Sequence, residues 1–158
     1  MTTRKLRKIG LAVISDGRLL VVRKRGTSKF ILPGGKPEKH EEDLDTLNRE
    51  VSEELGCAVR LPLFEGEFTD VASELSDTVV TIRLYSGQLL GTAQAASEIE
   101  ELVWIDLSGP SDTPLAPSLI NKILPHLRKS HCMEYGTLRD DSRSPATTQR
   151  IKGALEHL

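Results

Sequence analysis

The sequence has little cysteine, little net charge and no long apolar run, and each shortage excludes a class of protein. Its two cysteines, Cys57 and Cys132, are too few for a disulfide framework, so a reducing compartment such as the cytoplasm is expected. The net charge of −2 provides no general attraction to nucleic acid or to an anionic membrane, and no stable complex with either is expected. The apolar runs are too short to span a bilayer, and no signal peptide is recognisable.

The order of patterned segments predicts one mixed α/β domain. Its 158 residues are 38% hydrophobic and 28% charged, which is typical of a single globular domain. Apolar and β-branched runs predict strands at residues 8–14, 18–25, 30–32, 58–63, 64–69, 78–85 and 101–107. Helices are predicted at 43–55 and 118–129, and Pro33-Gly34-Gly35 is expected to interrupt regular structure. The domain is expected over residues 1–131, with a polar, mobile extension over 132–158.

The predicted helix at 43–55 has an apolar face and a defined end. An apolar stripe expected to face a core is formed by Leu44, Leu47, Val51 and Leu55. Gly56 follows directly, where a left-handed residue commonly ends a helix.

Glu50, Glu53 and Glu54 share a neighbouring face of this helix, close to its C-terminal end. Their mutual repulsion and the negative end of the helix dipole both disfavour carboxylates there. A divalent cation would relieve both effects, because Mg²⁺ and Mn²⁺ prefer oxygen ligands. The alternative is a solvated acidic helix face. Gly34 and Gly35 lie just upstream, and glycine backbone can approach a ligand closely.

Residues 35–57 (GKPEKHEEDLDTLNREVSEELGC) resemble the signature of the Nudix hydrolases at every fixed position. The fixed residues are Gly35, Glu41, Arg49, Glu50, Glu53, Glu54 and Gly56. Val51 fills the first apolar position, and Cys57 fills the last as a small hydrophobic residue. A looser resemblance extends over residues 5–128 and includes an acidic segment before Trp104 (SEIEELVW).

The resemblance implies an α/β/α sandwich with a mixed central sheet, and Mg²⁺- or Mn²⁺-dependent hydrolysis of a diphosphate bond. It implies that Glu50 and Glu54 are the chief metal ligands and that Glu53 is a ligand or the catalytic base. The Gly34 carbonyl completes such sites in relatives. Arg49, counted with the catalytic group, and Glu41 are expected to orient the loop and helix, while Gly35 and Gly56 have structural roles.

Three further groups outside this segment are candidates. One of Glu98, Glu100 and Glu101 is expected to act as a base or extra metal ligand, the alternative being an exposed acidic loop. The basic residues Arg23, Lys24, Arg25 and Lys29 either bind substrate phosphates or form solvated strand ends. Trp104 either stacks on a base or, as is more common for a tryptophan on an apolar strand, packs in the core.

The resemblance leaves the substrate open among three hypotheses. The first is a nucleoside triphosphate, including oxidised purines such as 8-oxo-dGTP, cleaved to monophosphate and pyrophosphate. In the segment SDTPLAPSLI, Asp112 matches a base-reading aspartate of one such enzyme, although Asp-Thr-Pro is also an ordinary turn. The second is ADP-ribose, a nucleotide sugar or a dinucleoside polyphosphate. The third is a non-catalytic nucleotide-binding module, which the intact glutamate set disfavours. A homodimer is expected because homodimers are frequent among relatives.

Overall fold

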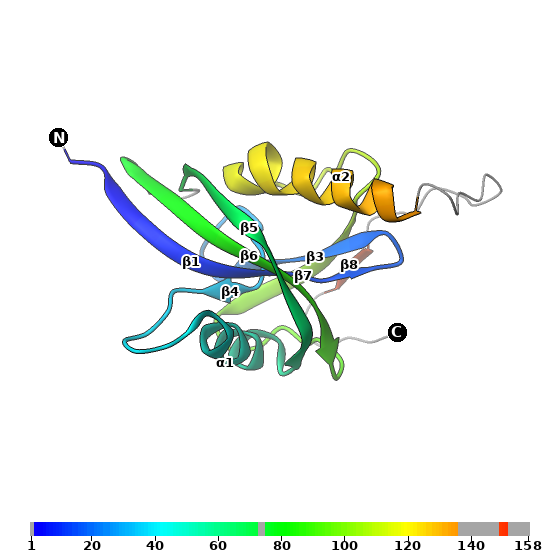
Figure 1. The fold of residues 1–158 in the computed structure, drawn as a ribbon, viewed down its shortest axis with the longest axis horizontal. Coiled ribbons are helices and arrows are strands. Elements are labelled where there is room, and N and C mark those ends of the chain that lie inside the picture. The colour runs from blue at the N-terminus through cyan, green and yellow to red at the C-terminus, as the bar shows by residue number, and fades with distance from the viewer. Residues whose placement is uncertain (1, 73–74, 136–148, 152–158) are drawn as a thin grey trace.

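A computed structural model describes residues 2–72, 75–135 and 149–151 of the chain. Two four-stranded sheets form a central layer between two helical segments (Figure 1). The first sheet contains, in spatial order, β4 (Gly34–Gly35), β1 (Arg4–Ala12), β6 (Thr78–Leu90) and β5 (Ala58–Val71). The second contains β2 (Ile14–Ser15), β3 (Arg18–Lys24), β7 (Ile99–Asp106) and β8 (Gln149–Ile151).

The strand directions make the central layer mixed. Strand β1 runs parallel to β6, and its pairing with β4 is antiparallel. Helix α1 (Asp43–Leu55) covers one side of the layer, and α2 (Leu124–Tyr135) covers the other (Figure 1). The predicted α/β/α sandwich with a mixed sheet is therefore confirmed. No helix among the described residues is both long enough and apolar enough to cross a membrane.

Side-chain alternation along the strands builds one core on each side of the layer. The core beneath α1 contains Ile9 and Leu11 of β1 with Leu47, Val51 and Leu55 of the helix, all fully buried. The core beneath α2 is built from Ala12, Leu19, Val21, Val103 and Ile105 on the strands and Leu119, Ile123, Leu124 and Leu127 on the helical side. Each helix is thus held by its own apolar face.

Helix α1 begins and ends with the local signals that its sequence carries. Glu42 and Asp45 form a reciprocal capping box, and Gly56 takes the left-handed conformation with φ of 68°, as expected. The expected burial of Leu44 is wrong: its side chain is 41% exposed, because packing against the sheet begins one turn later at Leu47. Thr46 is fully buried instead.

The glycine pair after Pro33 does not interrupt regular structure as expected, because Gly35 and Gly34 pair with Ile9 and Gly10 as strand β4. The segment expected as a strand at residues 30–32 forms only isolated bridges, Val22 to Ile31 and Phe30 to Leu115. The two strands expected at 58–63 and 64–69 are one strand, β5, with register shifts. Pairing with β1 brings the glycine pair next to α1.

The second helical segment starts as a π-helix, η1 (Leu119–Ile123), before α2 continues to Tyr135. Pro125 has no backbone N–H and would crowd an α-helical carbonyl four residues back, which favours the wider turn. Helix α2 crosses the expected domain boundary at residue 131, and β8 pairs with β7 within the expected extension. The remaining residues of that extension, 136–148 and 152–158, lie outside the described part.

Candidate active site

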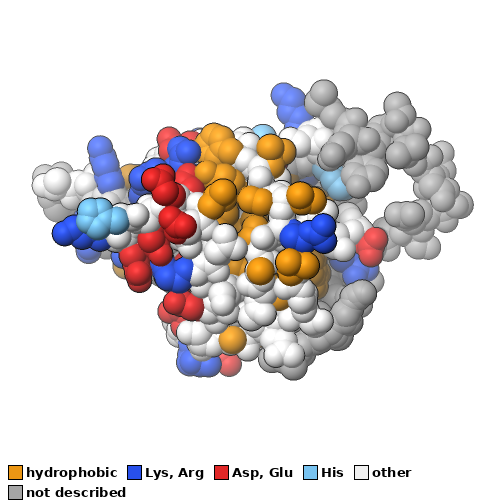
Figure 2. All heavy atoms as spheres, turned by 60° about the horizontal axis from the view of Figure 1, so that its bottom comes forward, with side chains coloured by type: hydrophobic (Ala, Val, Ile, Leu, Met, Phe, Trp, Pro, Cys, Tyr) orange, Lys and Arg blue, Asp and Glu red, His pale blue; other side chains and the backbone are white. Residues whose placement is uncertain are grey.

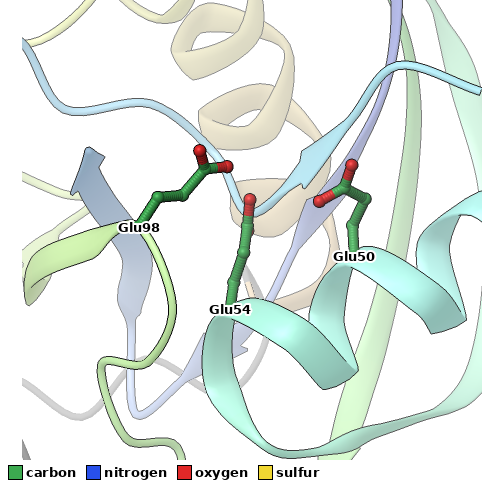
Figure 3. Close-up of side chains that lie close together, drawn as sticks. All are labelled: Glu50, Glu54 and Glu98. Carbon is green, nitrogen blue, oxygen red and sulfur yellow. The ribbon is translucent and has the colours of Figure 1, made fainter. Parts of the chain in front are cut away.

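Three carboxylates from two segments meet at one point of the structure. Glu50 and Glu54 project from α1, and Glu98 projects from the segment just before β7 (Figure 3). One oxygen of each carboxylate lies within 4.8 Å of the others. The structure therefore joins two members of the sequence motif to one of the three later glutamates.

Glu54 lies at the buried end of this cluster, with 1% of its surface exposed. The Gly34 N–H donates a 3.1 Å hydrogen bond to Glu54 Oε1, whereas Oε2 has no hydrogen-bond partner among the described residues. Burial is the main reason that the pKa of Glu54 rises to about 8; the Gly34 bond opposes the rise, and the nearby Glu50 adds to it. A buried carboxyl in this state takes up either a proton or a cation.

The backbone beside the cluster approaches more closely than a side chain would allow. A Cβ added at Gly35 would collide with the Glu50 side chain. At Gly34, φ is 137° and a Cβ would collide with the Ile9 carbonyl oxygen. Burial raises the pKa of Glu50 too, although Arg49 opposes the shift. Clustered oxygen donors, the unpartnered Glu54 Oε2 and close backbone together fit a divalent cation.

Arg49 ties the preceding loop to α1. Its Nε and Nη2 donate bonds of 2.7 and 2.9 Å to the two oxygens of Glu41, and Nη2 also donates to the Lys36 carbonyl oxygen. The bond from Arg49 is the main reason that the pKa of Glu41 falls to about 2. Arg49 Nη1 donates a 3.2 Å bond to Glu50 as well. This side chain thereby holds both the loop and a carboxylate of the cluster in place.

Glu53 lies outside the three-carboxylate cluster. Its side chain is 54% exposed, and its Oε1 lies 3.7 Å from Arg49 Nη1. The structure therefore separates Glu53 from the two motif glutamates with which the sequence grouped it.

The three later glutamates have different surroundings. Glu98 belongs to the cluster and lies 3.4 Å from Lys24 Nζ. Glu100 is exposed, with an oxygen 3.7 Å from Arg25 Nε. Glu101 is 3% exposed and accepts a 3.3 Å bond from Arg23 Nη2. Only Glu98 reaches the carboxylates of α1.

The other predicted residues are dispersed. Arg23 also donates to the Thr27 carbonyl oxygen, so its guanidinium is held by protein groups on two sides. Arg25 donates to the Ser97 carbonyl oxygen. Trp104 is partly buried against the core beneath α1, as expected for a core tryptophan. Asp112 is exposed on the loop before η1.

A cavity of about 200 Å³ opens beside the cluster. Gly34, Gly35, Lys8, Lys24 and Lys29 line it together with apolar side chains of β1 and β6, and Asp112 is not among its lining residues. Burial and the nearby Lys24 and Lys36 lower the pKa of Lys8, while Glu54 and Glu50 oppose the shift. Sequence reasoning missed Lys8. The sequence did carry one signal: in a strand, Lys8 points to the same face as Gly10 and Ala12.

Comparison with known proteins shows which family the chain resembles. The family model of the NUDIX domain matches residues 5–127. The uncharacterised Nudix hydrolase YvcI of Bacillus subtilis is 29% identical over 126 residues, which cover 78% of this chain and 79% of the relative.

Solved structures share the fold at low sequence identity. The MutT NUDIX hydrolase from Burkholderia pseudomallei has a TM-score of 0.67 and 21% identity, covering 78% of this chain and 98% of its own. A structure described as UDP-X diphosphatase has a TM-score of 0.66 and 20% identity, covering 85% of this chain and 66% of its own. Two structures with different descriptions thus resemble the fold of this chain about equally.

Proposed function

The chain belongs to the Nudix hydrolases, which act on compounds containing a linked nucleoside diphosphate, and from that premise we propose that its substrate is a nucleoside triphosphate. The proposed products are a nucleoside monophosphate and pyrophosphate, with Mg²⁺ or Mn²⁺ as cofactor. The observation that carries this proposal is the convergence of Glu50, Glu54 and Glu98 beside the Gly34–Gly35 backbone.

We propose that these three carboxylates and the Gly34 carbonyl hold the cation. A divalent cation bound there supplies charge neutralisation for the diphosphate and lowers the pKa of a water molecule. Arg49 fixes the Glu50 carboxylate and the Glu41 loop, so it acts as a positioning residue. Because these side chains are already held in place before the substrate binds, less entropy is lost when the reacting groups are oriented.

Two carboxylates are candidates for the base that takes a proton from the attacking water. Glu98 lies in the cluster itself, and Glu53 lies outside it, exposed and near Arg49. Glu101 is the weaker candidate because its carboxylate is held by Arg23 on the neighbouring strand. Among the three glutamates that follow the motif, we therefore propose Glu98 as the base or extra metal ligand.

The cavity supports a substrate with an anionic part and an apolar part. Lys8, Lys24 and Lys29 provide positive charge, and side chains such as Val80 and Ile82 provide apolar walls. Selection of oxidised purines by Asp112 has no support in the cavity lining. ADP-ribose, nucleotide sugars and dinucleoside polyphosphates remain the alternative substrates, and a binding module without turnover is the alternative function.

The test is hydrolysis with Mg²⁺ across the dNTPs, 8-oxo-dGTP, ADP-ribose, a nucleotide sugar and a dinucleoside tetraphosphate, with every product identified. We expect monophosphate plus pyrophosphate from one triphosphate at a kcat/KM roughly tenfold or more above the other substrates. Turnover restricted to substrates that are not triphosphates would reject this substrate class while keeping the family chemistry. Absence of turnover with both Mg²⁺ and Mn²⁺ would favour the binding module.

We also propose a homodimer formed through β5. This strand is an edge of the first sheet, and Leu61, Leu63 and Phe64 on it are exposed, as is Leu90 on β6. On the face turned forward in Figure 2, hydrophobic side chains gather beside a band of charged ones. An exposed apolar edge of this kind favours association with a second copy.

A further inference from the structure

Lys8 is a half-buried lysine that the proposal above counts only among the positive charges of the cavity, without a specific contact to the substrate. It lines the cavity beside the carboxylate cluster. The basic residues at and just after the end of β3 each lie near a protein carboxylate: Arg23 near Glu101, Lys24 near Glu98 and Arg25 near Glu100. The Lys8 backbone pairs with β6, but its ammonium makes no hydrogen bond or ion pair with another residue in the described part of the chain. A partly buried ammonium group without a protein partner loses part of its hydration, and an anion in the cavity would offset that loss.

Strand β1 sets the order of groups along the cavity. On one face of the strand, Gly10 pairs with Gly34, Lys8 lies opposite Ile82, and Leu6 lies opposite Val80. Residues two apart on a strand face the same side and are separated by about 7 Å. The cavity therefore presents the glycine backbone first, the Lys8 ammonium next, and the apolar side chains last.

The two ends of this series differ in chemistry. At the inner end, Gly34, the strand partner of Gly10, donates its N–H to Glu54, so this part of β1 lies beside the carboxylate cluster. At the outer end, Leu6 and Val80 offer only van der Waals contact. A molecule that fits this order carries its diphosphate at one end and a flat or apolar group at the other.

We propose that Lys8 binds the substrate phosphate that lies between the metal-binding carboxylates and the apolar end of the cavity. Lys8 thereby sets the direction in which the substrate lies: the diphosphate beside Gly34 and the attached group against Leu6 and Val80. The inference rests on the proposed function for the identity of the anion. A phosphate oxygen accepts hydrogen bonds from the ammonium, and no covalent step is involved.

The test compares Lys8→Met with Lys8→Arg and with Lys5→Met as the matched control. Methionine keeps the length and apolar stem of lysine but removes the charge. Lys5 lies on the same strand, is exposed and does not line the cavity. Two quantities are measured for each variant: kcat and KM for the best substrate of the panel, and the dissociation constant of inorganic pyrophosphate with Mg²⁺ by calorimetry.

For Lys8→Met we expect kcat/KM to fall and the dissociation constant of pyrophosphate to rise, each by about tenfold or more, which is typical of a lost hydrogen bond to a charged group. Lys8→Arg should recover most of both, and Lys5→Met should match the wild type. Inhibition by the uncharged nucleoside of the same substrate should not change in Lys8→Met, because that ligand has no phosphate. A melting temperature no lower than that of the wild type is expected, since the substitution removes a poorly compensated charge.

Unchanged pyrophosphate affinity in a folded Lys8→Met variant would overturn the proposal. So would an equal loss of affinity for pyrophosphate and for the uncharged nucleoside, since that pattern reports a distorted cavity. If Lys8→Met fails to fold, Lys8→Gln replaces it under the same criteria. A wild type that hydrolyses nothing would reject the proposed function, whereas the pyrophosphate affinities would still decide whether Lys8 binds the anion.

Discussion

Glu54 combines deep burial with a carboxylate oxygen that has no hydrogen-bond partner among the described residues. Glu54→Gln keeps the side-chain shape and an oxygen for the Gly34 N–H but removes the negative charge. Loss of a metal ligand should exceed the roughly 10–100-fold loss typical of residues that only support ligands, so turnover should fall by about a hundredfold or more. Mg²⁺ should raise the melting temperature of the wild type more than that of the variant. Wild-type activity in Glu54→Gln would remove Glu54 from the metal site.

The same residue makes the stability of the metal-free protein depend on pH. The pKa of Glu54 is about 8 in the folded protein against an ordinary value of 4.5. Between pH 4.5 and pH 8 the folded state binds more protons than the unfolded state. The stabilising contribution of protonated Glu54 to the free energy of unfolding is therefore complete below pH 4.5 and is lost as the pH rises through 8. In chelator-treated samples, the wild type should lose stability relative to Glu54→Gln as the pH rises across this window. Parallel denaturation profiles for the two proteins would contradict the assignment.

Glu98 and Glu100 form a matched pair for separating the cluster from its surroundings. Both lie before or at the start of β7 and both face a basic residue, but only Glu98 lies near Glu50 and Glu54. We expect Glu98→Gln to lower kcat/KM by roughly tenfold or more, as loss of a ligand or base implies. Glu100→Gln should stay close to the wild type. The reverse order, measured with the same substrate and Mg²⁺ concentration, would assign the role to Glu100.

At the scale of elements, the short strand β4 depends on the backbone freedom of Gly34. A Cβ at Gly34 would meet the Ile9 carbonyl oxygen at φ of 137°, whereas one at Gly17, with φ of 73°, meets nothing within 4 Å. Gly34→Ala should therefore lower the free energy of unfolding by at least about 3 kcal/mol, and Gly17→Ala by about 1 kcal/mol. Chemical denaturation of both variants measures the difference. Equal losses would show that the strain of positive φ, rather than the approach of β4 to β1, limits both positions.

Helix α1 could be predicted from sequence because its determinants are local. The spacing of Leu47, Val51 and Leu55 and the cap at Gly56 are properties of the chain itself. Strand β4 could not, because two glycines after a proline carry no strand pattern and pair only through the register of β1. Leu44 shows the same limit: helical phase predicts which way it faces, but not where the sheet that would cover it ends.

At the scale of the whole molecule, the site depends on distances that sequence spacing does not contain. Glu50 and Glu54 were predictable as a pair because one helix carries both. Glu98 rather than Glu101 reaches the pair because the segment before β7 lies close to α1. The Glu101 carboxylate instead forms an ion pair with Arg23 on β3. Lys8 joins the site only because β1, β4 and α1 pack together. The sequence alone was enough to predict the carboxylate pair on α1. It was not enough to predict which of several similar glutamates and lysines the fold brings to that pair.

The edge strand β5 gives the molecule a surface suited to a second copy. Its side chains Leu61 and Leu63 are 66% and 63% exposed, and such an edge presents unpaired backbone groups together with apolar surface. An antiparallel pairing of two β5 strands would satisfy both in a twofold arrangement. We expect the wild type to be a dimer by size-exclusion chromatography with light scattering, and Leu63→Lys to be a monomer.

Val71→Lys is the control for this prediction, because Val71 is 53% exposed at the other end of the same strand. It should leave the dimer intact if association centres on Leu61 and Leu63. Neither leucine lines the cavity, so kcat/KM should be the same for the Leu63→Lys monomer and the wild type. A wild type that stays monomeric over roughly a hundredfold range of concentration would exclude association through β5. A monomer that loses activity would instead show that the second copy supports the site.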